Sequence, residues 1–381
     1  MRNASPLDLP VASPWTVLAS LRLHDMAFLL ALAFLATAGV LALYSAAGGD
    51  WKPWAGSHAT RFMLSLAIIA AVACLGLRLL LRMAYVLYAL GLATLLGVQF
   101  FGEVGMGAQR WLDLGFVSIQ PSEFMKIALV AALARYYHHV PMDRAGTVLH
   151  AVPALVMVAV PAALVFLQPN LGTSLLLAMA GFAVIVMAGL PVWTLVAGGV
   201  AAGAAAPLLW MHMHDYQKLR VLTFLDPERD PLGAGYNIIQ SKIAFGSGGM
   251  WGKGFLQGSQ SQLGFLPEKH TDFILVLLAE EWGLVGATAV VAAFCVVIVY
   301  GYIVAFRAQH VFGRLLALGL TTSVFLYVFV NIAMITGLIP VVGIPLPLLS
   351  NGGTVMLATM VSAGLLLNVS LRPKLGRADA I

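Results

Sequence analysis

The sequence predicts an all-α polytopic integral membrane protein with about ten transmembrane helices. Two observations predict this fold class. Of the 381 residues, 61% are hydrophobic and only 10% are charged, whereas soluble domains carry roughly 25% charged residues. In addition, apolar runs of bilayer-spanning length recur along the whole chain. A soluble core could not bury this much apolar surface, so we expect a bilayer to act as its solvent.

Ten apolar runs have the length of a membrane span. The fourth run is short and begins beside a charged residue, and the eighth is long enough to tilt or to project beyond the bilayer. The predicted spans are Met26–Ala46, Thr60–Leu80, Met83–Phe101, Ser122–Tyr137, Val148–Leu167, Leu171–Ala188, Val192–Met211, Phe273–Val304, Leu315–Leu338 and Thr354–Leu371.

Lysine and arginine between the spans predict the orientation, because cytoplasmic loops carry an excess of both. A cytoplasmic N-terminus and an even number of spans place both termini in the cytoplasm. That side then carries Arg2, Arg22, Arg78, Arg82, Arg135, Arg144, Arg307, Arg314, Arg372, Lys374 and Arg377, whereas the short outer loops carry only Lys52, Arg61 and Arg110. The net charge of +5 therefore reflects topology, and we expect no nucleic-acid partner.

The spans define one large domain between two tails. We expect a cytoplasmic N-terminal tail (1–25), a single transmembrane domain (26–373) and a cytoplasmic C-terminal tail (374–381). Within the domain, a large extracytoplasmic loop (212–271) separates helices 7 and 8. Connections this long are usually functional or disordered, and the aromatic and apolar residues of this one argue against disorder.

The middle of the long loop is rich in glycine. Such backbone can adopt positive φ and approach a ligand closely, so it could cradle a phosphate or a sugar beside Lys253. The alternative is a flexible loop at the membrane surface. A Walker A motif is absent, because Ser247 stands where its first glycine is required. The pattern therefore argues against an enzyme that uses a soluble nucleotide donor.

Asp272 is the predicted catalytic residue. It stands where the loop enters the next span, directly after Lys269, His270 and Thr271. A carboxylate at the hydrocarbon edge is suited to act as a general base, and the neighbouring cations could bind an anionic substrate. The alternative is structural, in that Thr271 or Asp272 caps the helix that begins at Phe273.

Charged residues within the spans are candidates for function. Glu123 and Lys126 are three residues apart, so they share one face of a helix, and Arg110 in the preceding loop could reach the same pocket. The alternative for the pair is a structural ion pair inside the bundle. Asn170 is placed to cap the following helix, and we expect Glu280 and Glu281 to face polar neighbours or water rather than lipid.

Four sequence blocks identify the chain as a member of the SEDS family, in its RodA branch. The blocks are GAQRWLDLGFVSIQPSEFMKIALV from Gly107, QPNLGTSL from Gln168, the segment FGSGGMWGKG to LPEKHTDFILVLLAEEWG from Phe245, and GIPLPLLSNGG from Gly343. The resemblance covers nearly the whole chain. It departs at Asn170, where the family commonly has aspartate, so a charge-dependent role at this position is put in doubt while the cap role is kept.

The resemblance implies a peptidoglycan glycosyltransferase of the bacterial cytoplasmic membrane. Such enzymes polymerise lipid II into glycan strands for cell elongation and rod shape, beside a class B penicillin-binding protein and other proteins of the elongation complex. No cofactor is implied with certainty, and a divalent cation stays open. The family's essential aspartate corresponds to Asp272, its intramembrane pair to Glu123 and Lys126, and its loop arginine to Arg110.

Two other functions stay open at the level of sequence. The same outer cavity and intramembrane charges would serve a transporter that flips lipid II across the membrane. The third function is a non-catalytic scaffold of the elongation complex, in which Asp272 and Lys126 would each be dispensable.

Overall fold

The structure is a computed structural model that describes residues 13–105, 108–113, 115, 118–213, 218, 222–224, 226, 234–266 and 268–378. Residues 1–12 of the predicted N-terminal tail, including Arg2, and the last three residues of the predicted C-terminal tail lie outside the described residues. Parts of the predicted loop at 212–271 also lie outside them.

The described part of the chain is almost entirely helical, with one small antiparallel sheet. The helices are α1 (Pro14–Ala19), α2 (Leu23–Ala46), α3 (Ala55–Cys74), α4 (Leu77–Phe101), α5 (Pro121–His139), α6 (Met142–Ala145), α7 (Val148–Leu167), α8 (Leu171–Met187), α9 (Val192–His212), α11 (Ala234–Gly248), α12 (Ser259–Gln262), α13 (Ile274–Arg307), α14 (Val311–Ile335) and α15 (Gly353–Ala378). The strands β1 (Glu103–Gly105), β2 (Ala108–Asp113) and β3 (Ser118–Ile119) pair in the order β1-β2-β3.

The predicted all-α membrane fold is confirmed in outline. Nine of the ten predicted spans each overlap one helix, and among the described residues seven helices are long and apolar enough to cross a bilayer. These seven are α2, α3, α4, α7, α13, α14 and the Gly353–Arg372 part of α15. Helix α8 is apolar but shorter. The number of spans therefore stays a prediction.

One predicted boundary is wrong. The predicted span Thr60–Leu80 includes a turn between two helices, because α3 ends at Cys74 and α4 begins at Leu77 with Gly76 as its N-cap residue. Leu75 is extended (ψ 146°) and Gly76 has ψ 126°, so the backbone leaves the helix there. The apolar run continues through this turn, so hydropathy alone does not reveal it.

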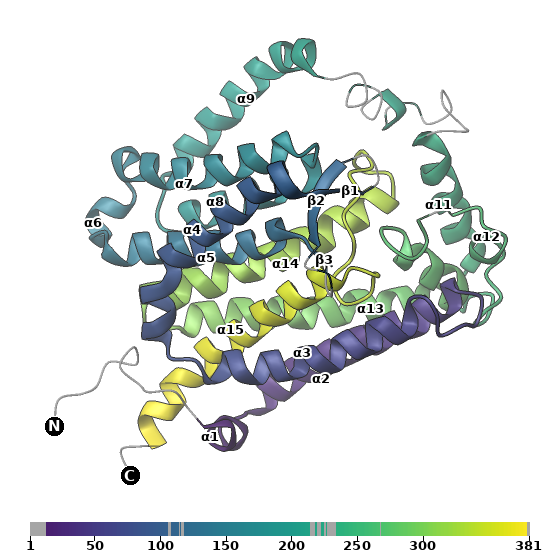
Figure 1. The fold of residues 1–381 in the computed structure, drawn as a ribbon, viewed down its shortest axis with the longest axis horizontal. Coiled ribbons are helices and arrows are strands. Elements are labelled where there is room, and N and C mark those ends of the chain that lie inside the picture. The colour runs from purple at the N-terminus through teal and green to yellow at the C-terminus, as the bar shows by residue number, and fades with distance from the viewer. Residues whose placement is uncertain are drawn as a thin grey trace.

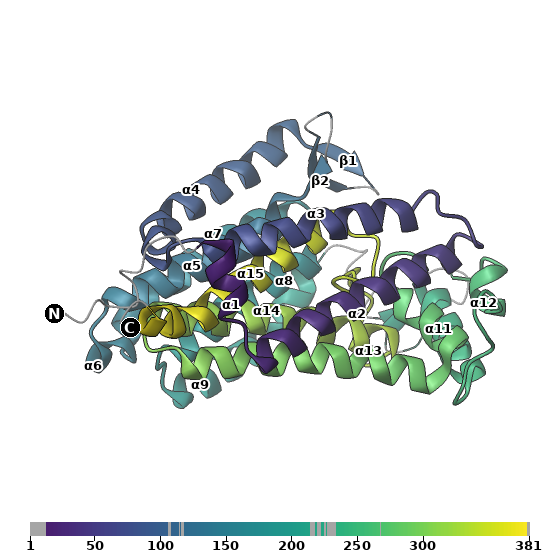
Figure 2. The same ribbon diagram turned by 90° about the horizontal axis from the view of Figure 1, so that it is seen from below.

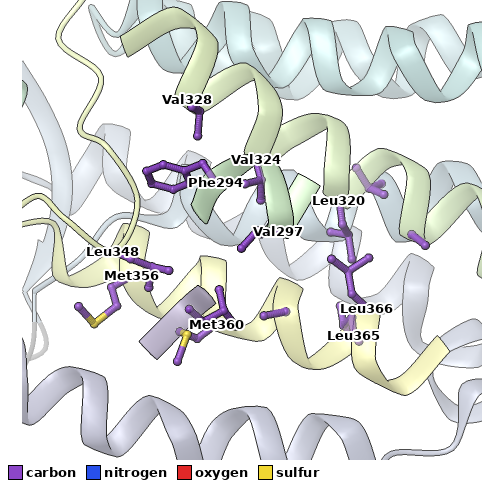
Figure 3. Close-up of a cluster of buried hydrophobic side chains, with 14 of the residues drawn as sticks. Phe294, Val297, Leu320, Val324, Val328, Leu348, Met356, Met360, Leu365 and Leu366 are labelled. Atoms are coloured by element: carbon purple, nitrogen blue, oxygen red, sulfur yellow. The ribbon is translucent and has the colours of Figure 1, made fainter. Parts of the chain in front are cut away.

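Helices α5, α14 and α15 form the centre of the bundle, and α2, α3, α4, α7, α8 and α13 pack around them (Figure 1). Figure 3 shows a cluster of buried apolar side chains from this centre. The labelled residues are Phe294, Val297, Leu320, Val324, Val328, Leu348, Met356, Met360, Leu365 and Leu366. In a bilayer such contacts stabilise the bundle through close packing rather than through exclusion of water.

Glycines let the central helices approach closely. A Cβ atom on Gly319 of α14 would lie 2.5 Å from the side chain of Val130 in α5. One on Gly181 of α8 would lie 2.6 Å from Val158 in α7. Both distances are shorter than any van der Waals contact, so larger residues would push the helices apart. Small residues at helix crossings are the usual means of tight packing in membranes.

The long helix α13 breaks near its start. Gly283 has φ 68° and ψ −167°, so the first turns of α13 are separated from the rest. The glycine-rich segment 248–254 docks on this break through four backbone hydrogen bonds. Lys253 N–H and Gly254 N–H donate to the carbonyls of Glu280 and Glu281, and Leu284 N–H and Val285 N–H donate to the carbonyls of Gly249 and Met250.

The two ends of the bundle differ. Helix α1 and the end of α15 lie together at one end, whereas α11 and α12 lie at the other end, in both views (Figures 1 and 2). Helix α2 runs the distance between them (Figure 2). The residues predicted to form the long loop thus include two helices, α11 and α12, at the end of the molecule away from α1.

Candidate functional site

A cavity of about 410 Å³ opens where the sheet, the turn between α7 and α8, and the beginnings of α5 and α13 meet. The segment between α14 and α15 completes its wall. Its lining is Arg110, Trp111, Gln120, Glu123, Pro169, Asn170, Leu171, Thr173, Glu268, Thr271, Asp272, Phe273, Tyr327, Val341, Val342, Gly343, Ile344, Pro345, Asn351, Gly352 and Val355. The volume is in the range of small-molecule sites, and several charged groups converge on it.

Asp272 lies in this wall, half-buried, one residue before the first turn of α13. Phe273 is the N-cap residue of α13, and no side chain forms a cap hydrogen bond there. Neither Thr271 nor Asp272 occupies the N-cap position, and the alternative that one of them helps to cap this helix stays a prediction. The hydroxyl of Thr271 instead donates to the carboxylate of Glu268 at 2.7 Å. The chain turns through Thr271 and Asp272 before the helix begins, which leaves Asp272 at the cavity.

Glu123 and Lys126 form an ion pair on α5. Their charged atoms are 2.8 Å apart, and both side chains are almost fully buried. The hydroxyl of Tyr327 on α14 donates to both carboxylate oxygens of Glu123 at 2.7 Å, and the Lys126 ammonium lies 4.1 Å from the Tyr327 ring centroid. A buried ion pair needs such additional partners to offset the cost of its desolvation.

The pair stands between two spaces. Glu123 and Tyr327 line the main cavity, and both also line a smaller chamber of about 30 Å³ together with Lys126. Serine and threonine side chains of α14 and α15 complete this chamber. Glu123 therefore faces the main cavity directly, and Lys126 lies one side chain behind it.

Arg110 lies on β2 and reaches the turn between α7 and α8. Its guanidinium donates a hydrogen bond to the carbonyl of Pro169, and it lines the same cavity as Glu123 and Asp272. Asn170 caps α8 as predicted, because its side-chain oxygen accepts from the Thr173 N–H at 3.4 Å. The sheet and the capped turn together hold the Arg110 guanidinium at the cavity.

Three other residues predicted to bind substrate lie outside the lining of this cavity. Lys253 forms an ion pair with Glu280 at 2.7 Å, and Lys269 donates to the carbonyl of Ser261 at 2.6 Å. His270 stacks on Trp54 with ring centroids 4.3 Å apart. Partial burial lowers the pKa of Lys269 and the pKa of His270. Their roles in binding stay predictions.

Glu280 faces polar neighbours, as expected. Besides Lys253, its carboxylate accepts hydrogen bonds from the backbone N–H groups of Gln260 and Ser261 and from the Ser261 hydroxyl. Glu281 accepts from the Ser45 hydroxyl at 2.5 Å. The glycine-rich segment is therefore attached to α13 through side chains as well as backbone.

Sequence reasoning missed Tyr327 and Asn331. Asn331 is fully buried, and its amide donates to the carbonyl of Asp272 at 2.9 Å. The signal was present in the sequence, because Ser323, Tyr327 and Asn331 follow one another at four-residue intervals in an otherwise apolar span. Polar residues at that spacing share one face of a helix and, in a membrane, face the interior of the bundle.

No group of three or more histidine, cysteine, aspartate or glutamate residues suited to hold a metal ion occurs among the residues that the structure describes. Glu268 and Asp272 both line the cavity. The requirement for a divalent cation stays open.

The comparisons with known proteins identify the family. The family model FTSW_RODA_SPOVE, described as a cell cycle protein, matches residues 23–374. This chain belongs to that family. The family resemblance drawn from the four sequence blocks is confirmed.

Named relatives of this FtsW/RodA/SpoVE member agree on an enzyme class. The peptidoglycan glycosyltransferase MrdB of Escherichia coli (strain K12) is 45% identical over 355 residues, which cover 92% of this chain and 94% of that protein. The probable peptidoglycan glycosyltransferase FtsW of Trichlorobacter lovleyi is 35% identical over 364 residues, with the same two coverages. The predicted enzyme class, peptidoglycan glycosyltransferase, is confirmed by these relatives.

Solved structures agree with the fold. A chain from a peptidoglycan synthase complex that coordinates polymerisation and crosslinking superimposes with a TM-score of 0.78 at 29% identity, over 90% of this chain and 96% of that one. The rod shape determining protein RodA of Thermus thermophilus superimposes with a TM-score of 0.68 at 26% identity, over 90% and 95%. This FtsW/RodA/SpoVE member is thus a multi-pass protein of the bacterial inner membrane.

Proposed function

We propose that this chain polymerises lipid II into glycan strands and that Asp272 is its general base. The observation that carries the proposal is the convergence of Asp272, Arg110 and Glu123 on one cavity. These residues come from three separate parts of the chain, and the family resemblance assigned each of them to the site. The names of the relatives support the type of reaction.

The chemistry needs one base and one cation. The Asp272 carboxylate takes the proton of the acceptor sugar hydroxyl, and that oxygen forms a bond to the anomeric carbon of the donor. The bond between this carbon and the pyrophosphate oxygen breaks, and undecaprenyl pyrophosphate leaves with the electron pair. Arg110, on the same cavity, stabilises the negative charge that develops on the leaving group.

The topology belongs to the same proposal. We propose ten spans with both termini in the cytoplasm and with the cavity, α11 and α12 on the outer side. The position of α1 and the end of α15 at the same end of the bundle supports both termini lying on one side of the membrane (Figure 1). We propose a class B penicillin-binding protein as the partner, because a structural relative belongs to a complex that joins polymerisation to crosslinking.

Polymerisation of purified lipid II by the detergent-solubilised protein tests the proposal. We expect Asp272→Asn to lower the rate of strand synthesis by at least about 100-fold, since general-base catalysis contributes roughly 10²–10⁴-fold. The matched control is Asp143→Asn, which makes the same change at an exposed carboxylate on α6 and should leave the rate unchanged. Near-normal synthesis by Asp272→Asn would remove this residue from the mechanism.

The same assay separates the enzyme from the two other functions. A flippase of lipid II forms no new bond, so it would make no polymer in detergent. A scaffold would make none either, and it would be indifferent to Asp272→Asn in a reconstituted complex. Runs with and without a divalent cation resolve the metal requirement.

A further inference from the structure

Three consecutive backbone carbonyls next to the proposed base accept hydrogen bonds from other parts of the chain. The carbonyl of His270 accepts from the Asn351 N–H at 2.9 Å. The carbonyl of Thr271 accepts from the Ser350 hydroxyl at 2.6 Å, and that of Asp272 accepts from the Asn331 side chain at 2.9 Å. The peptide segment that carries Asp272 is therefore fixed on its backbone at every residue.

Asn331 links this segment to a second segment of the cavity wall. Its side-chain nitrogen donates a second hydrogen bond, of 2.7 Å, to the carbonyl of Ile344. Both acceptors are carbonyl oxygens, so the amide must present its two N–H groups here. Ile344 and Asp272 both line the cavity, and Asn331 itself is fully buried on α14. One side chain thus sets the separation of two wall segments.

Ser350 makes a second link of the same kind. Its hydroxyl donates to Thr271, while its oxygen accepts from the Leu346 N–H at 2.8 Å. Gly343, next to Ile344, has φ +75°, and a Cβ atom there would lie 3.4 Å from an Asp272 carboxylate oxygen. The wall segment 343–351 therefore lies directly against the proposed base. Ser350 joins it to the carbonyl that precedes Asp272, and Asn331 joins it to the carbonyl of Asp272 itself.

We propose that Asn331 and Ser350 are positioning residues that hold the Asp272 carboxylate toward the acceptor sugar. This inference rests on the proposed function of Asp272. Fixing the backbone on both sides of a residue fixes the direction of its Cα–Cβ bond, and with it the reach of a short side chain. A displacement of about 1 Å at a reacting group can lower a rate by about 100-fold. A small shift of the backbone at Asp272 should therefore lower the rate of polymerisation.

The chain offers a matched control for a purely structural role. Asn368 on α15 is also a buried asparagine, and its side-chain nitrogen donates to the carbonyls of Val72, Ala73 and Leu75. These carbonyls lie at the junction of α3 and α4, which contributes nothing to the lining of the cavity. Asn331→Leu and Asn368→Leu therefore remove a buried amide donor beside the proposed base and one away from it, although Asn368 also accepts a hydrogen bond from Arg372.

The experiment measures kcat, KM and lipid II binding stoichiometry for both variants, with thermal melting in detergent. We expect Asn331→Leu to lower kcat by about 10- to 100-fold, with KM and stoichiometry close to those of the unchanged protein. Asn368→Leu should lower the melting temperature, but its kcat should be unchanged when it is calculated per protein molecule that binds lipid II. If Asn331→Leu does not fold, Ser350→Ala removes a single hydroxyl and should lower kcat in the same sense.

Two results would overturn the inference. One is a kcat for Asn331→Leu or for Ser350→Ala that stays within a few-fold of the unchanged protein. The other is a loss of activity that only follows the loss of binding-competent protein, as in Asn368→Leu. Asp272→Asn is measured beside them. If that variant polymerises normally, the proposed function has failed; if it is inactive while Asn331→Leu is normal, only the positioning role has failed.

Discussion

Two glutamate–lysine pairs in this molecule have nearly the same length and different surroundings. Glu123 and Lys126 lie 2.8 Å apart on one helix, and both are almost fully buried. Glu280 and Lys253 lie 2.7 Å apart, but they join α13 to the glycine-rich segment, and about a quarter of the Lys253 side chain is exposed. Only the first pair reaches the cavity, through Glu123. An ion pair alone therefore does not mark a functional site.

The difference lies in the other partners of each carboxylate. Among the residues that the structure describes, the Glu123 carboxylate accepts hydrogen bonds from Lys126 and from the Tyr327 hydroxyl only. Glu280 accepts from two backbone N–H groups and a serine hydroxyl in addition to Lys253. The carboxylate at the cavity thus depends on its lysine, whereas the other is held by a whole segment. Three predictions test this comparison.

The largest effect is expected for Lys126→Met. It leaves the buried Glu123 carboxylate without its cation, and breaking a buried pair on one side costs about 3–5 kcal/mol. Thermal melting in detergent should show a clear fall in Tm. The double variant Glu123→Gln with Lys126→Met removes both charges and should recover most of the loss. An unchanged Tm for Lys126→Met would show that Glu123 does not need its lysine.

A smaller effect is expected for the same substitution at the second pair. Lys253→Met leaves Glu280 with its backbone and serine donors. Because the partly exposed lysine is screened by solvent, the free energy of unfolding should fall by about 1 kcal/mol or less. The two methionine variants are compared in one melting experiment. A fall in Tm for Lys253→Met as large as that for Lys126→Met would end the distinction between the pairs.

The smallest effect concerns the response to acid and involves His270, two residues before Asp272. Burial lowers the pKa of His270, so the folded protein favours the neutral ring, while the unfolded chain takes up a proton near pH 6.5. The contribution of His270 to stability is therefore present above pH 6.5 and is lost as the pH falls below it. His270→Phe keeps a ring against Trp54 and should show a smaller fall in Tm between pH 7 and pH 5. An equal fall in both proteins would assign the acid sensitivity to other groups.

The long apolar helices could be predicted from the sequence because each carries its signal within one apolar run, whereas α11 and α12 lie in the predicted loop and were not predicted. The exceptions are places where a turn lies inside such a run, as at Leu75 and Gly76. The break of α13 at Gly283 is a second example. This break is paired by hydrogen bonds with the segment 248–254, which is distant in sequence, so no local sequence pattern predicts it.

The site was predictable for charged residues and less so for neutral ones. Asp272, Glu123 and Arg110 stand out as charges in or beside apolar spans, and they line one cavity. Asn331 and Tyr327 resemble ordinary polar residues until the contact between α14 and the start of α13 is known. Lys253 is a charged residue for which the sequence pattern was less informative. A lysine among glycines suggests an anion site, but the Lys253 ammonium forms an ion pair with Glu280.

The docking of the glycine-rich segment on α13 has a consequence for the order of assembly. A Cβ atom at Gly252 would lie 2.1 Å from the carbonyl oxygen of Glu281, so this backbone is shaped by a helix that follows it in the chain. During synthesis the segment emerges from the ribosome before its template exists. It can complete its docking only after the first turns of α13 have been made, because its backbone donors and acceptors pair with that helix.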